Sequence, residues 1–153
     1  MDPVVAKVTE QFKVVHDGLR KEVRDSSVEE LNWKPAPDTN SIAALVVHTL
    51  GSEAEVYRVV ANVPSTRDRP AEFLASAETP DQLIQQLDAA DAFIDDLAQR
   101  ITASDLQEDK PRGDRPPETG LHWLVTNYGH AREHLGHIQL TRQLYAMRSA
   151  AGD

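Results

Sequence analysis

The apolar residues of this chain recur at helical spacing in four separate stretches, and this periodicity constrains the fold more than any other feature. The clearest stretch follows Thr79-Pro80, where the apolar positions lie three or four apart: Leu83, Leu87, Ala90, Ile94, Leu97 and Ile101. Such spacing gathers these side chains on one face of a helix, as the seam of a helical bundle requires. We therefore predict a helix here.

Three further stretches show the same periodicity, and each begins at a residue type that caps helices. They run from Asp2-Pro3 to near Arg24, from Asn40 or Ser41 to about Ala61, and from Thr119 towards Met147. A short helical turn is expected near 26–31, before two prolines end it. The pattern thus predicts four long helices.

Two long connections separate these helices, at 62–78 and 104–118. Both combine proline with charged and small side chains, and neither is expected to form a core element. Residues 104–118 should be an exposed loop, because they cannot bury enough apolar area. With no convincing strand, the prediction is an all-α four-helix bundle with long crossover connections, formed by a single domain over residues 1–153.

Composition limits the partners and the metals that the protein could bind. Sixteen Lys and Arg against 25 Asp and Glu give a formal charge of −9, which disfavours nucleic acids and anionic lipid surfaces. Cysteine is absent, so a transition metal would need imidazole or carboxylate ligands, as zinc, nickel or iron accept.

The first residues lack the apolar run of a signal peptide, and no later apolar stretch is long enough for a membrane span, so we expect a cytoplasmic protein.

Three of the six histidines lie within residues 129–137, in the fourth predicted helix. His130 and His134 are four positions apart, so their Cβ atoms should lie on one helix face about 5–6 Å apart. Two imidazoles at this distance can share a metal ion if another element supplies a further ligand. Such a pair is also compatible with a solvated or hydrogen-bonded role, and both interpretations stay open.

His48 is the candidate for the third ligand. It is the only histidine of the second predicted helix, and Ala44, Gly51 and Ser52 leave space about one turn away. Three neutral histidines leave at least one coordination position of a divalent ion open, which is typical of catalytic rather than structural sites. Water or a substrate thiol could take that position.

Trp123, Asn127 and His137 share a strip of the fourth helix with the histidine pair, and we expect them to contact a cofactor or substrate. For His137 a place in the pocket wall, or a hydrogen bond to a ligand, is favoured over coordination, because three residues of one straight helix rarely converge on one ion. Trp123 is expected either in the core or at the pocket wall.

The other ionisable residues near these positions are expected to have no direct part in metal binding. His16 and His122 are interpreted as surface residues. Glu53 and Glu55 follow His48 within two turns and are interpreted as solvated, or as hydrogen-bond partners of the ligands.

The order of these features resembles the DinB/YfiT-like family of metal-dependent bundle proteins. Residues 31–42 are similar to the tryptophan-proline segment that leads into that family's second helix, and residues 47–53 to its first ligand and the small residues after it. Residues 130–137 are similar to the closing His-x-x-x-His motif and the Arg-Gly-Gln-like triplet after it. Only the glycine of that triplet, Gly136, is matched here.

The resemblance implies a four-helix bundle in which His48, His130 and His134 bind one divalent metal, often in a homodimer. It also implies a small-molecule substrate, since characterised members include transferases and isomerases that use low-molecular-weight thiols such as mycothiol or bacillithiol. The first hypothesis is therefore a metal-dependent enzyme of thiol transfer, with hydrolysis as a close variant. The alternative is a non-catalytic, metal-stabilised binding or stress-response module.

Overall fold

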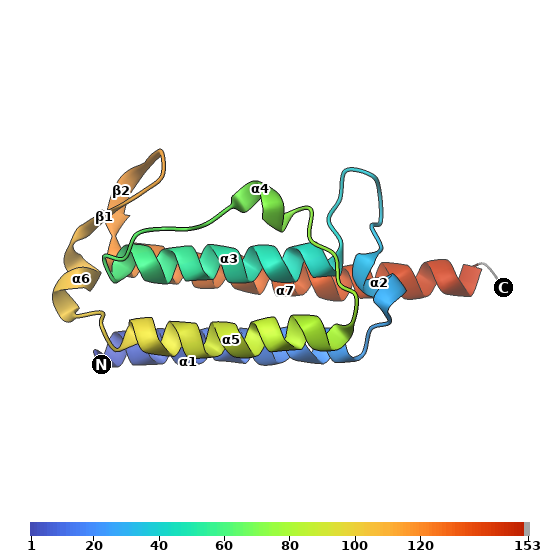
Figure 1. The fold of residues 1–153 in the computed structure, drawn as a ribbon, viewed down its shortest axis with the longest axis horizontal. Coiled ribbons are helices and arrows are strands. Elements are labelled where there is room, and N and C mark those ends of the chain that lie inside the picture. The colour runs from blue at the N-terminus through green and yellow to red at the C-terminus, as the bar shows by residue number, and fades with distance from the viewer. Residues whose placement is uncertain (152–153) are drawn as a thin grey trace.

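Four long helices lie side by side in the computed structural model, which describes residues 1–151 (Figure 1). They are α1 (Pro3–Arg24), α3 (Ile42–Val60), α5 (Pro80–Ala98) and α7 (Gly120–Ala151). Their first turns are capped by the side chains of Asp2, Ser41, Thr79 and Thr119, each of which accepts a backbone N–H. The predicted helices are confirmed, and Ser41 rather than Asn40 is the second cap.

The chain runs through the bundle with crossover connections, as predicted. Helices α1 and α7 run in one direction, and α3 and α5 run in the opposite direction (Figure 1). Helix α1 packs against α5 and α7, and α3 packs against the same two helices. The chain therefore crosses the bundle diagonally from α1 to α3 and from α5 to α7, and it returns along the bundle between α3 and α5.

Short elements occupy the connections. They are α2 (Val28–Asn32), α4 (Arg69–Glu72), α6 (Ala103–Gln107), β1 (Asp109–Arg112) and β2 (Arg115–Thr119). The α4 segment lies across the outer face of α3, and the two strands form a hairpin beside the first turns of α7 (Figure 1). Within residues 1–151, none of the helices has an apolar stretch long enough to cross a bilayer.

A continuous apolar core fills the space between the four long helices. Its fully buried large side chains include Phe12, Leu19, Ile42, Tyr57, Leu83, Leu87, Ile94, Leu124 and Ile138. The rings of Tyr57 and Tyr128 both pack edge-on against Phe12, which joins three of the helices. The core is built from the positions whose periodicity predicted the helices, so burial of these stripes is the main stabilising interaction of the bundle.

The expectation of a loop over 104–118 is wrong, because this stretch contains most of α6 and the antiparallel hairpin β1–β2, although most of its residues are exposed as expected. Few apolar residues are available there, and charged hydrogen bonds hold the segment instead. The ammonium of Lys110 is buried and donates to Asn62, Asp105 and Glu108 at 2.9 Å each. The backbone carbonyl of Lys110 accepts a hydrogen bond from the indole N–H of Trp123 at 2.9 Å, which connects β1 to α7.

His16 is fully buried, so its interpretation as a surface residue is also wrong. Its Nδ1 lies 2.7 Å from Asp91 on α5, and its Nε2 lies 3.0 Å from Glu53 on α3. Burial alone would lower the pKa of His16, but the hydrogen bonds to these two carboxylates outweigh it and raise the pKa to about 9. Glu53 is likewise buried rather than solvated, as the partner of a charged histidine between three helices.

The charge of His16 predicts a pH dependence of stability. Its pKa is about 9 in the folded protein against 6.5 for a free side chain, so protonated His16 stabilises the fold fully below pH 6.5. The contribution is lost as the pH rises through 9. We expect the free energy of unfolding, measured by urea denaturation, to fall by about 3 kcal/mol over this range. This fall should be much smaller in His16→Gln, and in the surface variant His122→Gln it should equal that of the wild type. Equal falls in all three proteins would contradict the raised pKa of His16.

Candidate metal centre

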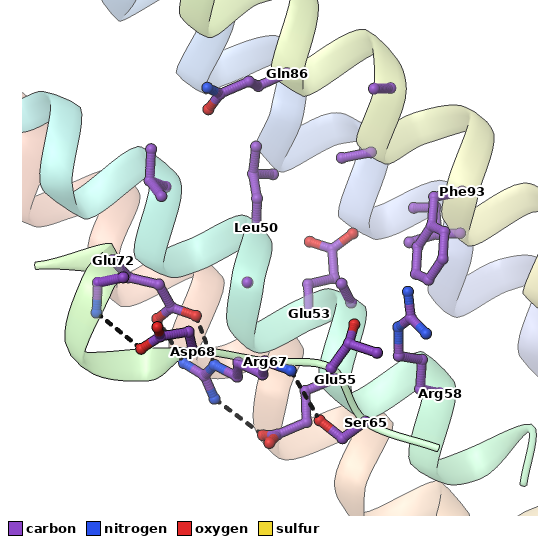
Figure 2. A pocket seen from close by; sticks show the side chains of 18 residues that line it. Leu50, Glu53, Glu55, Arg58, Ser65, Arg67, Asp68, Glu72, Gln86 and Phe93 are labelled. Carbon is purple, nitrogen blue, oxygen red and sulfur yellow. Dashed lines mark hydrogen bonds and ion pairs between the residues drawn. The ribbon is translucent and has the colours of Figure 1, made fainter. Parts of the chain in front are cut away.

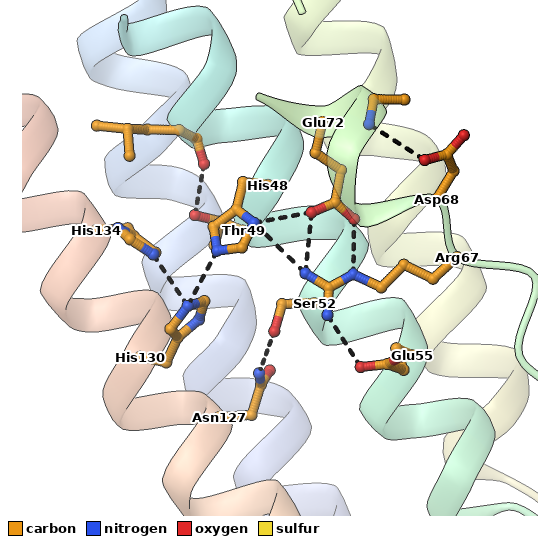
Figure 3. Close-up of polar contacts among 12 residues, drawn as sticks. His48, Thr49, Ser52, Glu55, Arg67, Asp68, Glu72, Asn127, His130 and His134 are labelled. Atoms are coloured by element: carbon orange, nitrogen blue, oxygen red, sulfur yellow. Dashed lines mark hydrogen bonds and ion pairs between the residues drawn. The ribbon is translucent and has the colours of Figure 1, made fainter. Parts of the chain in front are cut away.

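Ring nitrogens of His48, His130 and His134 converge between α3 and α7 (Figure 3). The Nε2 atom of His130 lies 3.3 Å from Nε2 of His48 and 2.9 Å from Nε2 of His134. One nitrogen from each ring lies within 4.8 Å of the other two, so the three residues could hold one metal ion. The tertiary structure thus brings together the three residues that the sequence singled out.

Glu72 determines which nitrogen of His48 faces the other two rings. Its Oε2 atom lies 2.8 Å from Nδ1 of His48, and Phe73 packs against the imidazole face with the ring centroids 4.5 Å apart. An ionised carboxylate can only accept, so Nδ1 carries the proton and Nε2 presents its lone pair to the site. This carboxylate–histidine arrangement is typical of histidines that bind metals.

The three rings are in the state that a metal requires. Burial, followed by the charges of neighbouring histidines, lowers the pKa values of His130 and His134 to about 4. Burial also lowers the pKa of His48, despite the opposing effect of Glu72. All three are therefore neutral at pH 7, with lone pairs available for coordination.

Asn127, Trp123 and His137, which were predicted to contact a cofactor or substrate, lie in three different environments in the structure. Asn127 is buried beside the histidines, and its Nδ2 donates to Ser52 Oγ at 2.8 Å. Trp123 is buried in the core, held by its bond to the Lys110 carbonyl. His137 has half of its side chain exposed, and its Nδ1 lies 3.3 Å from Nδ1 of His134, the nitrogen that faces away from the other two ligand candidates.

Sequence reasoning missed the residues that surround the histidines from the connections. Arg67 donates to both oxygens of Glu72, at 2.7 and 2.9 Å, and also to Glu55 at 2.9 Å. Arg112 of β1 donates to the same oxygen of Glu55 at 2.9 Å. Glu55 is therefore an ion-pair partner of two arginines rather than a solvated residue. No periodic pattern marks such residues, because they lie in short irregular segments.

Two cavities share Arg67 as a border residue. The smaller, which we call the arginine pocket, is bordered by His48, Ser52, Arg67, Arg69, Arg112, Arg115, Thr126, Asn127 and His130, and has a volume of about 130 Å³. The larger, of about 620 Å³, lies between α3, α5 and the α4 segment; Figure 2 shows Leu50, Glu53 and Phe93 along it. The arginine pocket is bordered by His48 and His130, whereas none of the three histidines borders the larger cavity.

The fold and the three converging histidines together identify the chain as an all-α bundle protein with crossover connections and a candidate metal site. The model of the DinB superfamily matches residues 11–138, so the chain belongs to this superfamily. The resemblance seen in the sequence is thereby confirmed. A search of curated proteins found no match.

Solved structures show the same fold. The chain is similar to a conserved protein from Enterococcus faecalis, with a TM-score of 0.78 and 20% identity over 94% of this chain and 98% of that one. It is also similar to a DinB-like protein from Bacillus subtilis, with a TM-score of 0.70 and 17% identity over 90% of this chain and 91% of that one. At these identities the likeness concerns the fold alone.

Proposed function

We propose that the protein is a metal-dependent enzyme in which His48, His130 and His134 bind one divalent ion, namely zinc, nickel or iron. The observation that carries this proposal is the convergence of three neutral imidazole nitrogens beside a pocket. Imidazole suits all three metals. A three-histidine set leaves a coordination position for a reactant, as in catalytic sites.

The proposed reaction is the transfer of a low-molecular-weight thiol, of the mycothiol or bacillithiol type, to an electrophile, with hydrolysis as the close variant. The chemistry that a divalent ion supplies when bound is to lower the pKa of a thiol or of water, which provides a nucleophile at neutral pH. Glu72 would keep the proton of His48 on Nδ1 and fix the orientation of its ring. Phe73 excludes water from one face of the same ring.

Asn127 is the residue best placed to orient a reactant in the arginine pocket. Its Nδ2 is used by Ser52, whereas its buried Oδ1 has no hydrogen-bond partner within residues 1–151. A buried acceptor without a partner is costly, and a thiol, hydroxyl or water in the pocket could donate to it. His137 would act through Nδ1 of His134, which it approaches at 3.3 Å. Trp123 would support the pocket from the core by holding β1 in place.

The first test is the metal content of protein purified without a histidine tag. We expect about one equivalent of divalent metal in the wild type and none in His48→Ala or His134→Ala, because two imidazoles cannot hold the ion at the same affinity. His122→Ala, which removes an exposed imidazole, should retain the metal. Absence of metal after growth in metal-replete medium would overturn the proposal.

Metal removal separates the enzyme from the alternative, a metal-stabilised binding or stress-response module. The apolar core extends through all four long helices without using the histidines. We therefore expect the metal-free protein to keep its helical circular dichroism and to unfold cooperatively, with a modest decrease in Tm. Collapse of the fold on chelation would favour the module, whose binding free energy would be folding free energy.

Gly51 allows a test of the Glu72 carboxylate beside His48. A Cβ atom at Gly51 would lie 2.1 Å from Glu72 Oε1, so Gly51→Ala must shift this carboxylate, which also accepts from Arg67, and we expect the shift to disrupt its hydrogen bond with His48. Loss of such a hydrogen bond typically weakens metal binding about 10–100-fold, which we expect in a zinc titration. Gly136→Ala is the matched control, because its new Cβ meets nothing within 4 Å. Equal zinc affinities of the two variants would contradict the role of Glu72.

The reaction itself is tested by thiol consumption. Metal-loaded protein should accelerate the coupling of mycothiol or bacillithiol to an electrophilic alkylating reagent, and His134→Ala should reduce the rate to that of the uncatalysed reaction. Thiol loss and product formation are followed by mass spectrometry. An ester substrate without thiol tests the hydrolytic variant in the same assay. Inactivity in both assays with fully loaded protein would favour the non-catalytic alternative.

A further inference from the structure

The four arginines of the arginine pocket come from separate parts of the chain, yet their side chains border one small cavity. Arg67 and Arg69 belong to the connection and α4, whereas Arg112 and Arg115 flank the turn of the β1–β2 hairpin and are cross-strand partners. The tertiary structure thus brings two basic pairs together beside the histidines. Among the nine residues that border the cavity, none carries a carboxylate.

Two carboxylates form ion pairs with only two of the four arginines. Glu55 and Glu72 form ion pairs with Arg67, and Glu55 also forms one with Arg112. Within the described chain, Arg69 and Arg115 form no ion pair, and both side chains are exposed. Arg69 stacks over the ring of Phe73 at 5.1 Å, a contact that leaves its N–H groups able to donate. The pocket therefore has two guanidinium groups without an acceptor.

Ser52 adds a further donor at the inner end of the pocket. Its Oγ accepts from Asn127 Nδ2 at 2.8 Å and from Arg112 Nη2 at 3.3 Å. Two donors occupy both lone pairs of a hydroxyl oxygen, so the hydroxyl proton is left to donate. Within residues 1–151 this proton has no acceptor. Guanidinium groups around a hydroxyl donor match the planar or tetrahedral oxygens of an oxyanion.

The arrangement is unfavourable without a counter-ion. Burial, together with the positive charges of Arg115 and Arg67, outweighs the pairing with Glu55 and lowers the pKa of Arg112. Like charges gathered around a small cavity repel one another, and this repulsion persists although the whole chain carries a net charge of −9. An anion in the pocket would remove the repulsion.

We propose that the arginine pocket binds the carboxylate or phosphate group of a small organic anion, and that this anion is the substrate of the metal centre. The volume of about 130 Å³ admits one such group. An outer cavity of about 310 Å³ leaves room for the rest of the molecule; the same four arginines, Gly113 and the carboxylates of Glu55 and Asp114 border it. The substrate assignment rests on the proposed function, whereas anion binding by the arginines does not need the metal.

The experiment uses full-length, metal-free protein at constant ionic strength, with inorganic phosphate and succinate as probes and uncharged succinamide as a blank. We expect phosphate, succinate or both to raise Tm in a saturable manner and to bind in isothermal calorimetry, because a ligand that binds only the folded state stabilises it. The tighter probe identifies the group that the pocket prefers. Succinamide should have no effect.

The double variant Arg69→Ala/Arg115→Ala tests the site, since both residues are exposed and form no ion pair in the described chain. We expect its anion affinity to fall by at least about tenfold. The matched control is Arg24→Ala/Arg132→Ala, which removes the same charge from exposed positions on α1 and α7 and should bind as the wild type does. Equal loss in both variants would show a general charge effect and overturn the proposal, as would failure of both probes to bind.

The same variants keep this proposal separate from the proposed function. Metal content measured on the Arg69→Ala/Arg115→Ala variant should stay at about one equivalent, because neither arginine touches a histidine nitrogen within 3.5 Å. If anions bind but the wild type contains no metal, anion binding by the arginine pocket is supported and the proposed metal-dependent function is contradicted. If metal binds and anions do not, anion binding and the substrate assignment both fail, whereas the proposed metal centre is unaffected.

Discussion

The antiparallel packing of α3 against α7 determines whether this chain has a site at all, because His48 and His130 are 82 residues apart in the sequence. Close approach of the two helices needs small side chains at the contact. Ser52 is such a residue, and it is buried at this contact. The hydrogen bond between Ser52 and Asn127 crosses the same contact. A small change in the packing of these helices would therefore move one ligand candidate relative to the other two.

The walls of the site are held by charge rather than by apolar burial. Glu55 accepts hydrogen bonds from Arg67 of the α4 connection and from Arg112 of the hairpin, so one carboxylate positions two otherwise separate segments. Burying such groups is costly, and removing one partner of a buried ion pair typically destabilises a protein by about 3–5 kcal/mol. The gain is rigidity next to the histidines, where irregular segments without a core would otherwise be mobile.

The distribution of charge gives the site its chemical character. The whole chain carries a net charge of −9, while the pocket beside the histidines is lined by arginines and by neutral polar groups. A positive pocket in an acidic protein favours small anions over polyanions, because the surrounding surface repels a large anion and the cavity accepts a small one. The arginines also disfavour protonation of His48 and His130, which keeps their lone pairs available.

The sequence by itself determined the four long helices, their caps and the identity of the three histidines, because helical periodicity and i,i+4 spacing are local properties. It failed for residues 104–118 and for His16, where buried hydrogen-bonded charges replace apolar contacts and leave no periodic signal. Only the tertiary structure brought His48 to the histidine pair and gathered four arginines from two connections into one pocket. These contacts join residues far apart in the chain, and their geometry follows from helix packing and ion pairing rather than from any local pattern.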